Sequence, residues 1–185
     1  IVAGGGPYLG NNLWDATQMT ASFAYRALKH QGFTKNDIYY LSADIDLDLD
    51  GNTFADDIFN VPTSSTLENA LSEASGENVE NLVLYLTDHG GITQDGSGSF
   101  LLSQSETLTS TDLATMLDSV QPGIPGRITV IIDACQSGSF RDDLQGNDRI
   151  IITSSSEEQQ AKFLNQGTIS FSHFFWSYIF SGASL

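Results

Sequence analysis

The chain has 185 residues, of which 40% are hydrophobic and 10% aromatic, so it can bury the core of one compact domain and is too apolar for a disordered chain. It carries 23 acidic against 7 basic side chains, a formal net charge of −16. This charge repels nucleic-acid backbones and anionic membrane surfaces, and no apolar run approaches the roughly 20 residues of a membrane span. Nucleic acid and membrane insertion are therefore not expected. Cations, either calcium or basic peptides, complement the acidic field, although acidity also simply keeps a secreted protein soluble.

Strands and helices alternate along the chain. An apolar segment at residues 1–4 predicts a first strand that enters a Gly-rich turn, and Ser65 with Glu68 forms a capping box that opens a helix. A Gly- and Ser-rich stretch at residues 92–108 predicts a small hairpin. The predicted strands cover residues 1–4, 38–41, 82–87, 128–132 and 149–153, and the predicted helices cover residues 15–31, 65–74, 110–120 and 170–180. This order predicts an α/β fold, a mainly parallel sheet flanked by helices, with functional sites beyond the carboxyl ends of the strands.

Two motifs follow the two most apolar predicted strands. Thr87-Asp88-His89-Gly90-Gly91 comes after one, and Asp133-Ala134-Cys135-Gln136-Ser137-Gly138 comes after the other. If these strands are neighbours, His89 and Cys135 emerge at the same edge of the sheet. A thiol that attacks a peptide carbonyl must become a thiolate, and imidazole can take its proton and later return one to the leaving amine. We expect the backbone N–H groups of Gly90 and Cys135 to bind the oxyanion.

Each residue read alone has a structural explanation. A single cysteine excludes an intrachain disulfide and is most often a small buried hydrophobe. A histidine before glycines is a weak signal, because it can simply be satisfied in a loop. Both motifs at the ends of the two most apolar strands are harder to explain without a function.

The segments 84–90 (LYLTDHG) and 131–139 (IIDACQSGS) resemble the two signature segments of the legumain family of cysteine peptidases, which shares its fold with caspases, metacaspases, clostripain and gingipains. The likeness extends to the opening strand, to residues 151–156 and to residues 171–178. It implies a caspase-like three-layer sandwich, a Cys135/His89 dyad, peptide or protein substrates, and no cofactor in catalysis. It also implies that the segment after Thr153 lines the substrate cleft; the residues concerned are Ser154, Ser155 and Ser156.

The sequence departs from legumains where they recognise the P1 side chain. Legumains carry an Arg-His pair after the first strand, and residues 11–15 (NNLWD) contain neither residue. Two positions before the nucleophile, legumains have Glu and this chain has Asp133; in metacaspases and clostripain, Asp at this place selects Arg or Lys. Charge complementarity therefore favours a basic P1 residue over Asn or Asp, and Asp15 is a further candidate for the pocket. Alternatively, Asp133 is a strand-end carboxylate that only accepts backbone hydrogen bonds.

Residues 44–57 contain a calcium-loop pattern. Asp46, Asp48 and Asp50 fall at positions 1, 3 and 5 of the loop, Asn52 follows Gly51, and Asp57 falls at position 12. The preceding segment is predicted as a strand, so the pattern is an isolated loop and not an EF-hand. We expect a structural Ca²⁺ on an insertion after the second strand; the alternative is a solvated acidic turn.

Taken together, residues 1–185 are predicted to form one caspase-like peptidase domain, clipped at both ends from a larger chain whose other domains are further candidate partners. The expected function is that of a cysteine endopeptidase, secreted to the extracellular space or the periplasm, whose targeting segment lies outside this chain. The alternative is a catalytically inactive, peptidase-like calcium-binding interaction module of a larger extracellular protein. A calcium-dependent adhesion or scaffold domain is a third hypothesis, supported only by the acidic loop.

Overall fold

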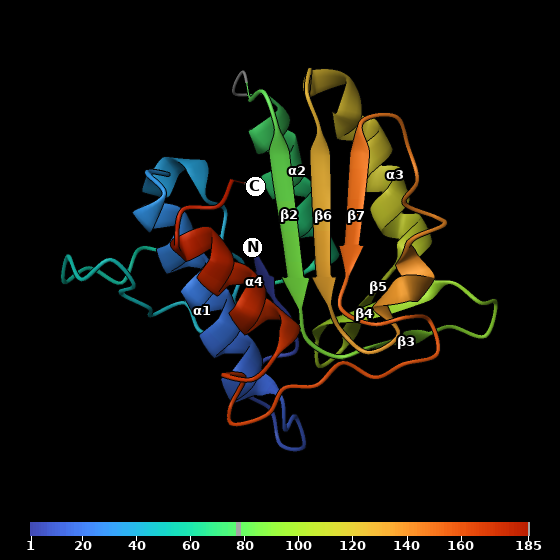
Figure 1. Cartoon of the computed structure of the whole chain (residues 1–185), viewed down its shortest axis with the longest axis horizontal. Helices are drawn as coiled ribbons and strands as arrows, with labels where there is room; N and C mark the ends of the chain where they lie inside the picture. The colour runs from blue at the N-terminus through green and yellow to red at the C-terminus, as the bar shows by residue number, and fades with distance from the viewer. Residues whose placement is uncertain (77–78, 185) are drawn as a thin grey trace.

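A four-stranded parallel sheet forms the middle layer of the protein (Figure 1). The computed structural model describes residues 1–76 and 79–184. The strands lie in the order β1-β2-β6-β7, and each pairs in parallel with its neighbour. Their bounds are Val2–Ala3 for β1, Leu82–Thr87 for β2, Ile128–Asp133 for β6 and Arg149–Thr153 for β7.

Helices cover both faces of this sheet (Figure 1). Helices α1 and α4 pack together on one face, and α2 and α3 pack together on the other. Their bounds are Trp14–His30 for α1, Ser64–Gly76 for α2, Ser110–Val120 for α3 and Phe171–Phe180 for α4. The three layers confirm the predicted caspase-like architecture.

The continuous apolar sequences of β2 and β6 follow from this double cover. Tyr85 and Ile131 are register partners that enter the core beneath α1 and α4, whereas Leu84 and Val130 enter the core beneath α2 and α3. A strand buried on both faces does not alternate between apolar and polar residues. The two strands predicted to carry the motifs are therefore direct neighbours.

A second, antiparallel sheet lies beside the carboxyl ends of the parallel strands (Figure 1). It contains β3 (Gly90–Ile92), β4 (Gly98–Ser103) and β5 (Glu106–Thr109). The hairpin predicted at residues 92–108 is thus part of a three-stranded sheet, because the glycines after His89 form the first strand. Three short 3₁₀ helices complete the described structure: η1 (Lys35–Asp37), η2 (Gln121–Gly123) and η3 (Ser137–Phe140).

The strand predicted at residues 38–41 is wrong in extent. Only Leu41 is bridged, to Val2 on one side and to Asn60 on the other. The reason is that β1 contains two residues, so it offers one bridging position to this segment, whose backbone exchanges hydrogen bonds with Ile1 and Ala3. No helix among residues 1–76 and 79–184 is long and apolar enough to cross a bilayer.

Candidate active site

The two motif-bearing loops meet at the carboxyl ends of β2 and β6. Thr87 and Asp133, the last residues of these strands, are register partners. Gly90 lies against the backbone of the second loop, since a Cβ at that position would stand 2.4 Å from the carbonyl oxygen of Cys135. Both His89 and Cys135 are half-buried. The structure therefore brings the backbones that carry the imidazole and the thiol together and leaves both side chains partly accessible.

The loop after Cys135 is held in a sharp turn. Gln136 has a φ of 56°, in the left-handed region that a residue with a side chain seldom adopts. Its N–H donates to the carbonyl of Gln159 at 2.7 Å. Ser155 supports the same loop, because its hydroxyl donates to the Ala134 carbonyl at 2.9 Å and accepts from the Ser137 N–H at 3.2 Å. The segment after β7 thus fixes the residues on both sides of the thiol.

The three serines predicted to line the cleft have different roles. Ser155 is buried and supports the nucleophile loop. Ser156 is exposed and lies beside Gly138. A Cβ at Gly138 would stand 2.6 Å from the backbone nitrogen of Glu157, so this close approach requires glycine. Ser154 is half-buried. The segment does line a cavity of about 380 Å³ together with Arg141. A larger cavity, of about 930 Å³, is bordered by β1, the start of β2 and α2 and does not include the dyad residues.

Asn11 fixes the tautomer of His89. The amide of Asn11 is oriented by two backbone hydrogen bonds: its Oδ1 accepts from the Leu13 N–H at 3.0 Å, and its Nδ2 donates to the Gly6 carbonyl at 3.0 Å. The same Oδ1 lies 3.1 Å from Nε2 of His89. Because a carboxamide oxygen only accepts, Nε2 carries the proton in neutral His89, and Nδ1 keeps a free lone pair. In this tautomer Nδ1 is the nitrogen that can take up a proton.

Sequence reasoning missed Asn11, which it used only to note that the Arg-His pair of legumains is absent. A signal was present. Asn11 belongs to the loop that follows β1, and β1 is the neighbour of β2, so the rule that places sites at the carboxyl edge applies to this loop as well.

Asp88 lies buried beneath the histidine. Its Oδ1 accepts the His89 N–H at 2.6 Å, and its Oδ2 accepts the hydroxyl of Thr17 on α1 at 3.2 Å. A Cβ at Gly5 would lie 2.7 Å from Oδ2, so the Gly-rich turn is packed directly against the carboxylate. Burial raises the pKa of Asp88, and the His89 N–H, the His89 charge and the Thr17 hydroxyl oppose that rise. Asp88 therefore ties the histidine backbone to α1.

Asp133 is fully buried at the end of β6. Its Oδ2 accepts two hydrogen bonds from Ser172 in the first turn of α4, one from the N–H at 3.0 Å and one from the hydroxyl at 2.5 Å. Burial raises the pKa of Asp133, and the two donors on Ser172 oppose the rise; the hydroxyl of Ser154 lies nearby and acts in the same direction without meeting the geometry of a hydrogen bond. Asp15, the other pocket candidate, is exposed in the first turn of α1. The start of α4 thus donates two hydrogen bonds to the buried carboxylate of Asp133.

Three buried oxygen atoms at the strand ends have no hydrogen-bond partner among the residues that the structure describes. They are Oγ1 of Thr87, Oδ1 of Asp133 and Oγ of Ser154. Thr87 and Asp133 are register partners on adjacent strands, and Ser154 directly follows β7, whose Thr153 pairs with Ile132. Unpaired buried polar groups are costly, so these oxygens destabilise the sheet edge unless another group pairs with them.

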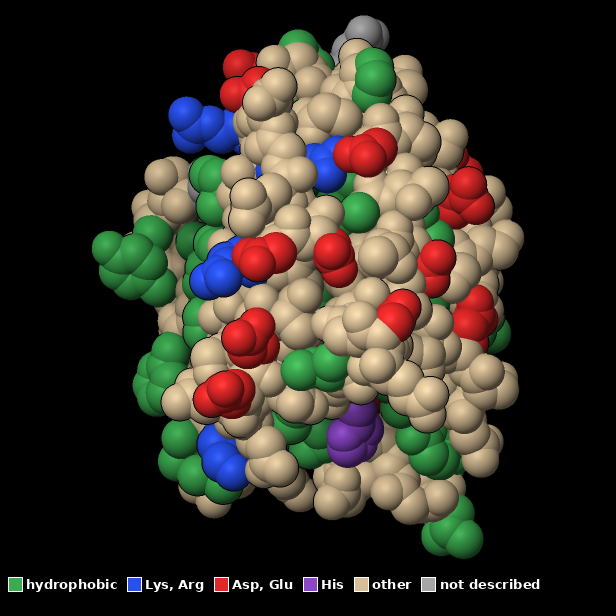
Figure 2. Space-filling model, turned by 90° about the vertical axis from the view of Figure 1, so that its right-hand side faces the viewer, with side chains coloured by type: hydrophobic (Ala, Val, Ile, Leu, Met, Phe, Trp, Pro, Cys, Tyr) green, Lys and Arg blue, Asp and Glu red, His purple; other side chains and the backbone are tan. Residues whose placement is uncertain are grey.

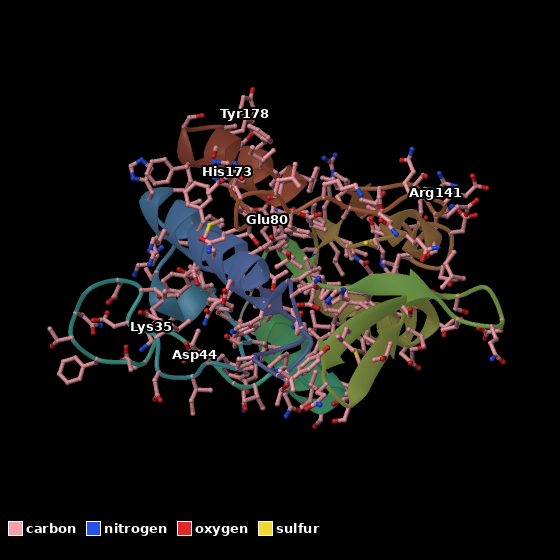
Figure 3. All side chains as sticks on the ribbon, turned by 90° about the horizontal axis from the view of Figure 1, so that it is seen from below. Lys35, Asp44, Glu80, Arg141, His173 and Tyr178 are labelled. Carbon is pink, nitrogen blue, oxygen red and sulfur yellow. The ribbon has the colours of Figure 1, made fainter. Side chains whose placement is uncertain are left out.

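The acidic loop brings three of its five predicted ligands together. One oxygen each of Asp48, Asp50 and Asp57 lie within 4.8 Å of one another, whereas Asp46 is exposed and outside this cluster. Asp57 is buried: Tyr25 donates its hydroxyl to Oδ1, and the Leu49 N–H donates to Oδ2 at 2.6 Å. Asn52, the fifth candidate, accepts the Phe54 N–H through its side-chain oxygen at 2.7 Å. The loop extends from the body on the side away from Arg141 (Figure 3).

Acidic side chains are also scattered over the surface outside these sites (Figure 2). Figure 2 shows one face on which scattered Asp and Glu side chains outnumber the Lys and Arg side chains. Three ion pairs join described residues: Lys35 with Asp56, Arg141 with Asp142 and Arg149 with Asp118. Because acidic side chains outnumber basic ones by 23 to 7, the electrostatic field around the protein is negative.

The layered fold, with a histidine loop and a cysteine loop at the carboxyl ends of adjacent parallel strands, defines the class of caspase-like proteins. The Peptidase C13 family model matches residues 74–173, which is 100 of the 185 residues. The chain belongs to the peptidase C13 family, the legumain family of cysteine peptidases, whose members act on protein or peptide substrates. A comparison with curated proteins found no match.

Proposed function

We propose that the chain is an endopeptidase in which Cys135 is the nucleophile and His89 the general acid and base. The observation that carries the proposal is the fixed tautomer of His89, whose Nε2 faces the oxygen of Asn11 at 3.1 Å and whose Nδ1 is left as the basic nitrogen. The contact between Gly90 and the Cys135 backbone supports it, because it joins the two loops that supply the reacting groups.

The reaction proceeds in two stages. Nδ1 of His89 takes the thiol proton, the sulfur of Cys135 forms a bond to the scissile carbonyl carbon, and the N–H groups of Gly90 and Cys135 stabilise the oxyanion. The imidazolium then protonates the leaving amine as the C–N bond breaks, which leaves a thioester. Water, deprotonated by His89, attacks the thioester, and the thiol regains its proton as the C–S bond breaks.

The proposed P1 preference is for Arg or Lys over Asn or Asp, and Asp133 determines it. Asp133 is buried, its Oδ1 has no partner among the described residues, and a cationic donor from the substrate completes its hydrogen bonding. Ser154 and Thr87 offer hydroxyls beside it. Asp15 is exposed in the first turn of α1, and its role in the pocket stays a prediction.

Active-site substitutions test the proposal. Cys135→Ala is expected to abolish cleavage of a fluorogenic peptide library, and His89→Ala is expected to reduce it by a factor of about 10²–10⁴, the usual contribution of a positioned acid or base. A thiol-reactive peptide probe should label Cys135, and a substrate should block the labelling. Folded wild-type protein that resists the probe and cleaves no peptide would instead support the non-catalytic binding module.

The proposed structural cation is Ca²⁺, held by the loop at residues 44–57. Asp48, Asp50 and Asp57 supply the hard oxygen ligands that Ca²⁺ prefers, and like charges this close repel one another unless a cation lies between them. An isolated loop of this type is suited to millimolar calcium, which is consistent with the proposed location outside the cytoplasm. Asp46 would have to move to join the cluster.

A further inference from the structure

A buried chain of hydrogen bonds joins β2, α4 and β6 beneath the proposed P1 pocket. The hydroxyl of Tyr85 donates to Oγ of Ser172 at 2.5 Å, and that hydroxyl in turn donates to Oδ2 of Asp133 at 2.5 Å. All three residues are at most 1% exposed. Because Tyr85 occupies the acceptor side of the Ser172 hydroxyl, the proton of Ser172 is directed to Asp133.

Ser172 binds only one oxygen of the carboxylate. Its backbone N–H, in the first turn of α4, donates to the same Oδ2 at 3.0 Å. Oδ1 of Asp133 has no partner among the described residues, and neither has the hydroxyl of Ser154. The contacts of Ser172 therefore fix the rotation of the carboxyl group and hold its two oxygens in different surroundings.

We propose that Ser172 is a positioning residue that sets P1 selectivity by holding Asp133 with one oxygen bound to α4 and the other free to accept from a basic substrate side chain. The inference rests on the proposed function, because it concerns the pocket next to the Cys135/His89 dyad. Ser172 touches neither the substrate nor the reacting atoms.

Two effects follow when the Ser172 hydroxyl is removed. The charged form of Asp133 loses one of its two donors, and the carboxyl group becomes free to rotate so that Oδ1 turns toward the N–H at the start of α4. Both effects weaken the binding of a peptide with a cationic P1 side chain more than the binding of a peptide with a neutral carboxamide at P1. A hydrogen bond to a charged group typically changes an equilibrium by a factor of about 10–100.

The experiment compares two peptides that differ only at P1, one with Arg and one with Asn. Binding to protein that carries Cys135→Ala is measured by fluorescence anisotropy, and turnover is measured with Cys135 intact. The variants are Ser172→Ala, Ser172→Thr, which keeps the hydroxyl, and Tyr85→Phe. The matched control is Ser170→Ala, because the Ser170 hydroxyl caps the same helix by accepting the His173 N–H and does not contact Asp133.

The expected result is a fall of about tenfold or more in the Arg-to-Asn affinity ratio for Ser172→Ala, carried by KM rather than kcat in the turnover assay. Tyr85→Phe should cause a smaller fall, Ser172→Thr should restore the ratio, and Ser170→Ala should lower thermal stability alone. An unchanged ratio in folded Ser172→Ala, or an equal change in Ser170→Ala, overturns the inference. Selective binding without turnover overturns the proposed chemistry only, so the two failures are distinguishable.

Discussion

Replacement of Asn11 by Ala tests how the histidine is held. The substitution removes the acceptor of Nε2 of His89 and two further hydrogen bonds, one from the Leu13 N–H and one to the Gly6 carbonyl. These two backbone groups must then find water, at a cost of about 1–3 kcal/mol in the free energy of unfolding. The loss is moderate because the side chain of Asn11 is only half-buried.

The effect on catalysis should be larger than the effect on folding. Without the acceptor, His89 is free to exchange its tautomers and to rotate. A positioned general base accelerates a reaction by a factor of about 10²–10⁴, and we assign a factor of about 10–100 of this to the orientation of the ring. We therefore expect kcat/KM to fall by about 10–100-fold, through kcat. Alkylation of Cys135 by iodoacetamide should slow as well, because it reports the thiolate that His89 helps to form.

The assay needs a neighbour that lacks these contacts. Asn12 is exposed and adjacent, so Asn12→Ala serves as the control, and circular dichroism measures the stability of both variants. If Asn11→Ala loses stability but keeps kcat and the alkylation rate within about twofold of wild type, the tautomer argument is refuted and Asn11 only shapes the loop.

Three other predictions concern the acids and the close backbone contact. Burial raises the pKa of Asp133 in the folded protein. Wild type should therefore be most stable relative to Asp133→Asn below about pH 4, the ordinary pKa of a carboxyl group, and should lose that advantage as the pH rises through the raised pKa of the folded state. Urea unfolding over a range of pH measures the difference. Calcium at about 100 times its Kd should stabilise wild type by about 2.7 kcal/mol, EGTA should reverse the rise in Tm, and Asp57→Asn should not respond. Gly90→Ala places a methyl group 2.4 Å from the Cys135 carbonyl oxygen and should cost about 1–3 kcal/mol and most of the activity. Gly76→Ala should cost neither, because no described atom beyond its chain neighbours and its own helix backbone lies within 4 Å of the added methyl group.

The sequence predicts the centre of the fold well, because a strand buried on both faces leaves an unbroken apolar run. The apolar runs at residues 82–87 and 128–132 identified β2 and β6 and, with them, the edge at which the two motifs lie. The pattern is weaker where pairing is short. Leu41 is bridged at a single position, and the glycines that start β3 carry no side chains from which a strand can be recognised.

The contacts that orient the site were not visible in the sequence, because they join distant segments through single hydrogen bonds. Asn11 reaches His89 across 78 positions, and Ser172 reaches Asp133 across 39. The helix that contains Ser172 was recognised by its aromatic residues. Of these Trp176 is buried, whereas Phe174, Tyr178 and Phe180 are exposed, and their pattern carries no signal for the serine among them. Ligand spacing also predicts Asp46 as a calcium ligand; it lies outside the cluster of Asp48, Asp50 and Asp57, and its role stays a prediction.

In the proposed P1 pocket, charge acts at two ranges, and only the shorter one distinguishes P1 residues. The net charge of −16 attracts cationic peptides generally, but its influence in solution decays over about 8 Å at physiological salt, so it raises the encounter rate of any basic segment. Asp133 acts at contact, where water does not screen it. The burial that strengthens its attraction to a guanidinium also makes the unpaired carboxylate costly, and the two Ser172 donors offset only part of that cost. Selectivity in the proposed pocket therefore depends on the hydrogen-bond donor that Oδ1 lacks. A basic P1 side chain supplies a donor that carries a positive charge, whereas a carboxamide supplies an uncharged donor.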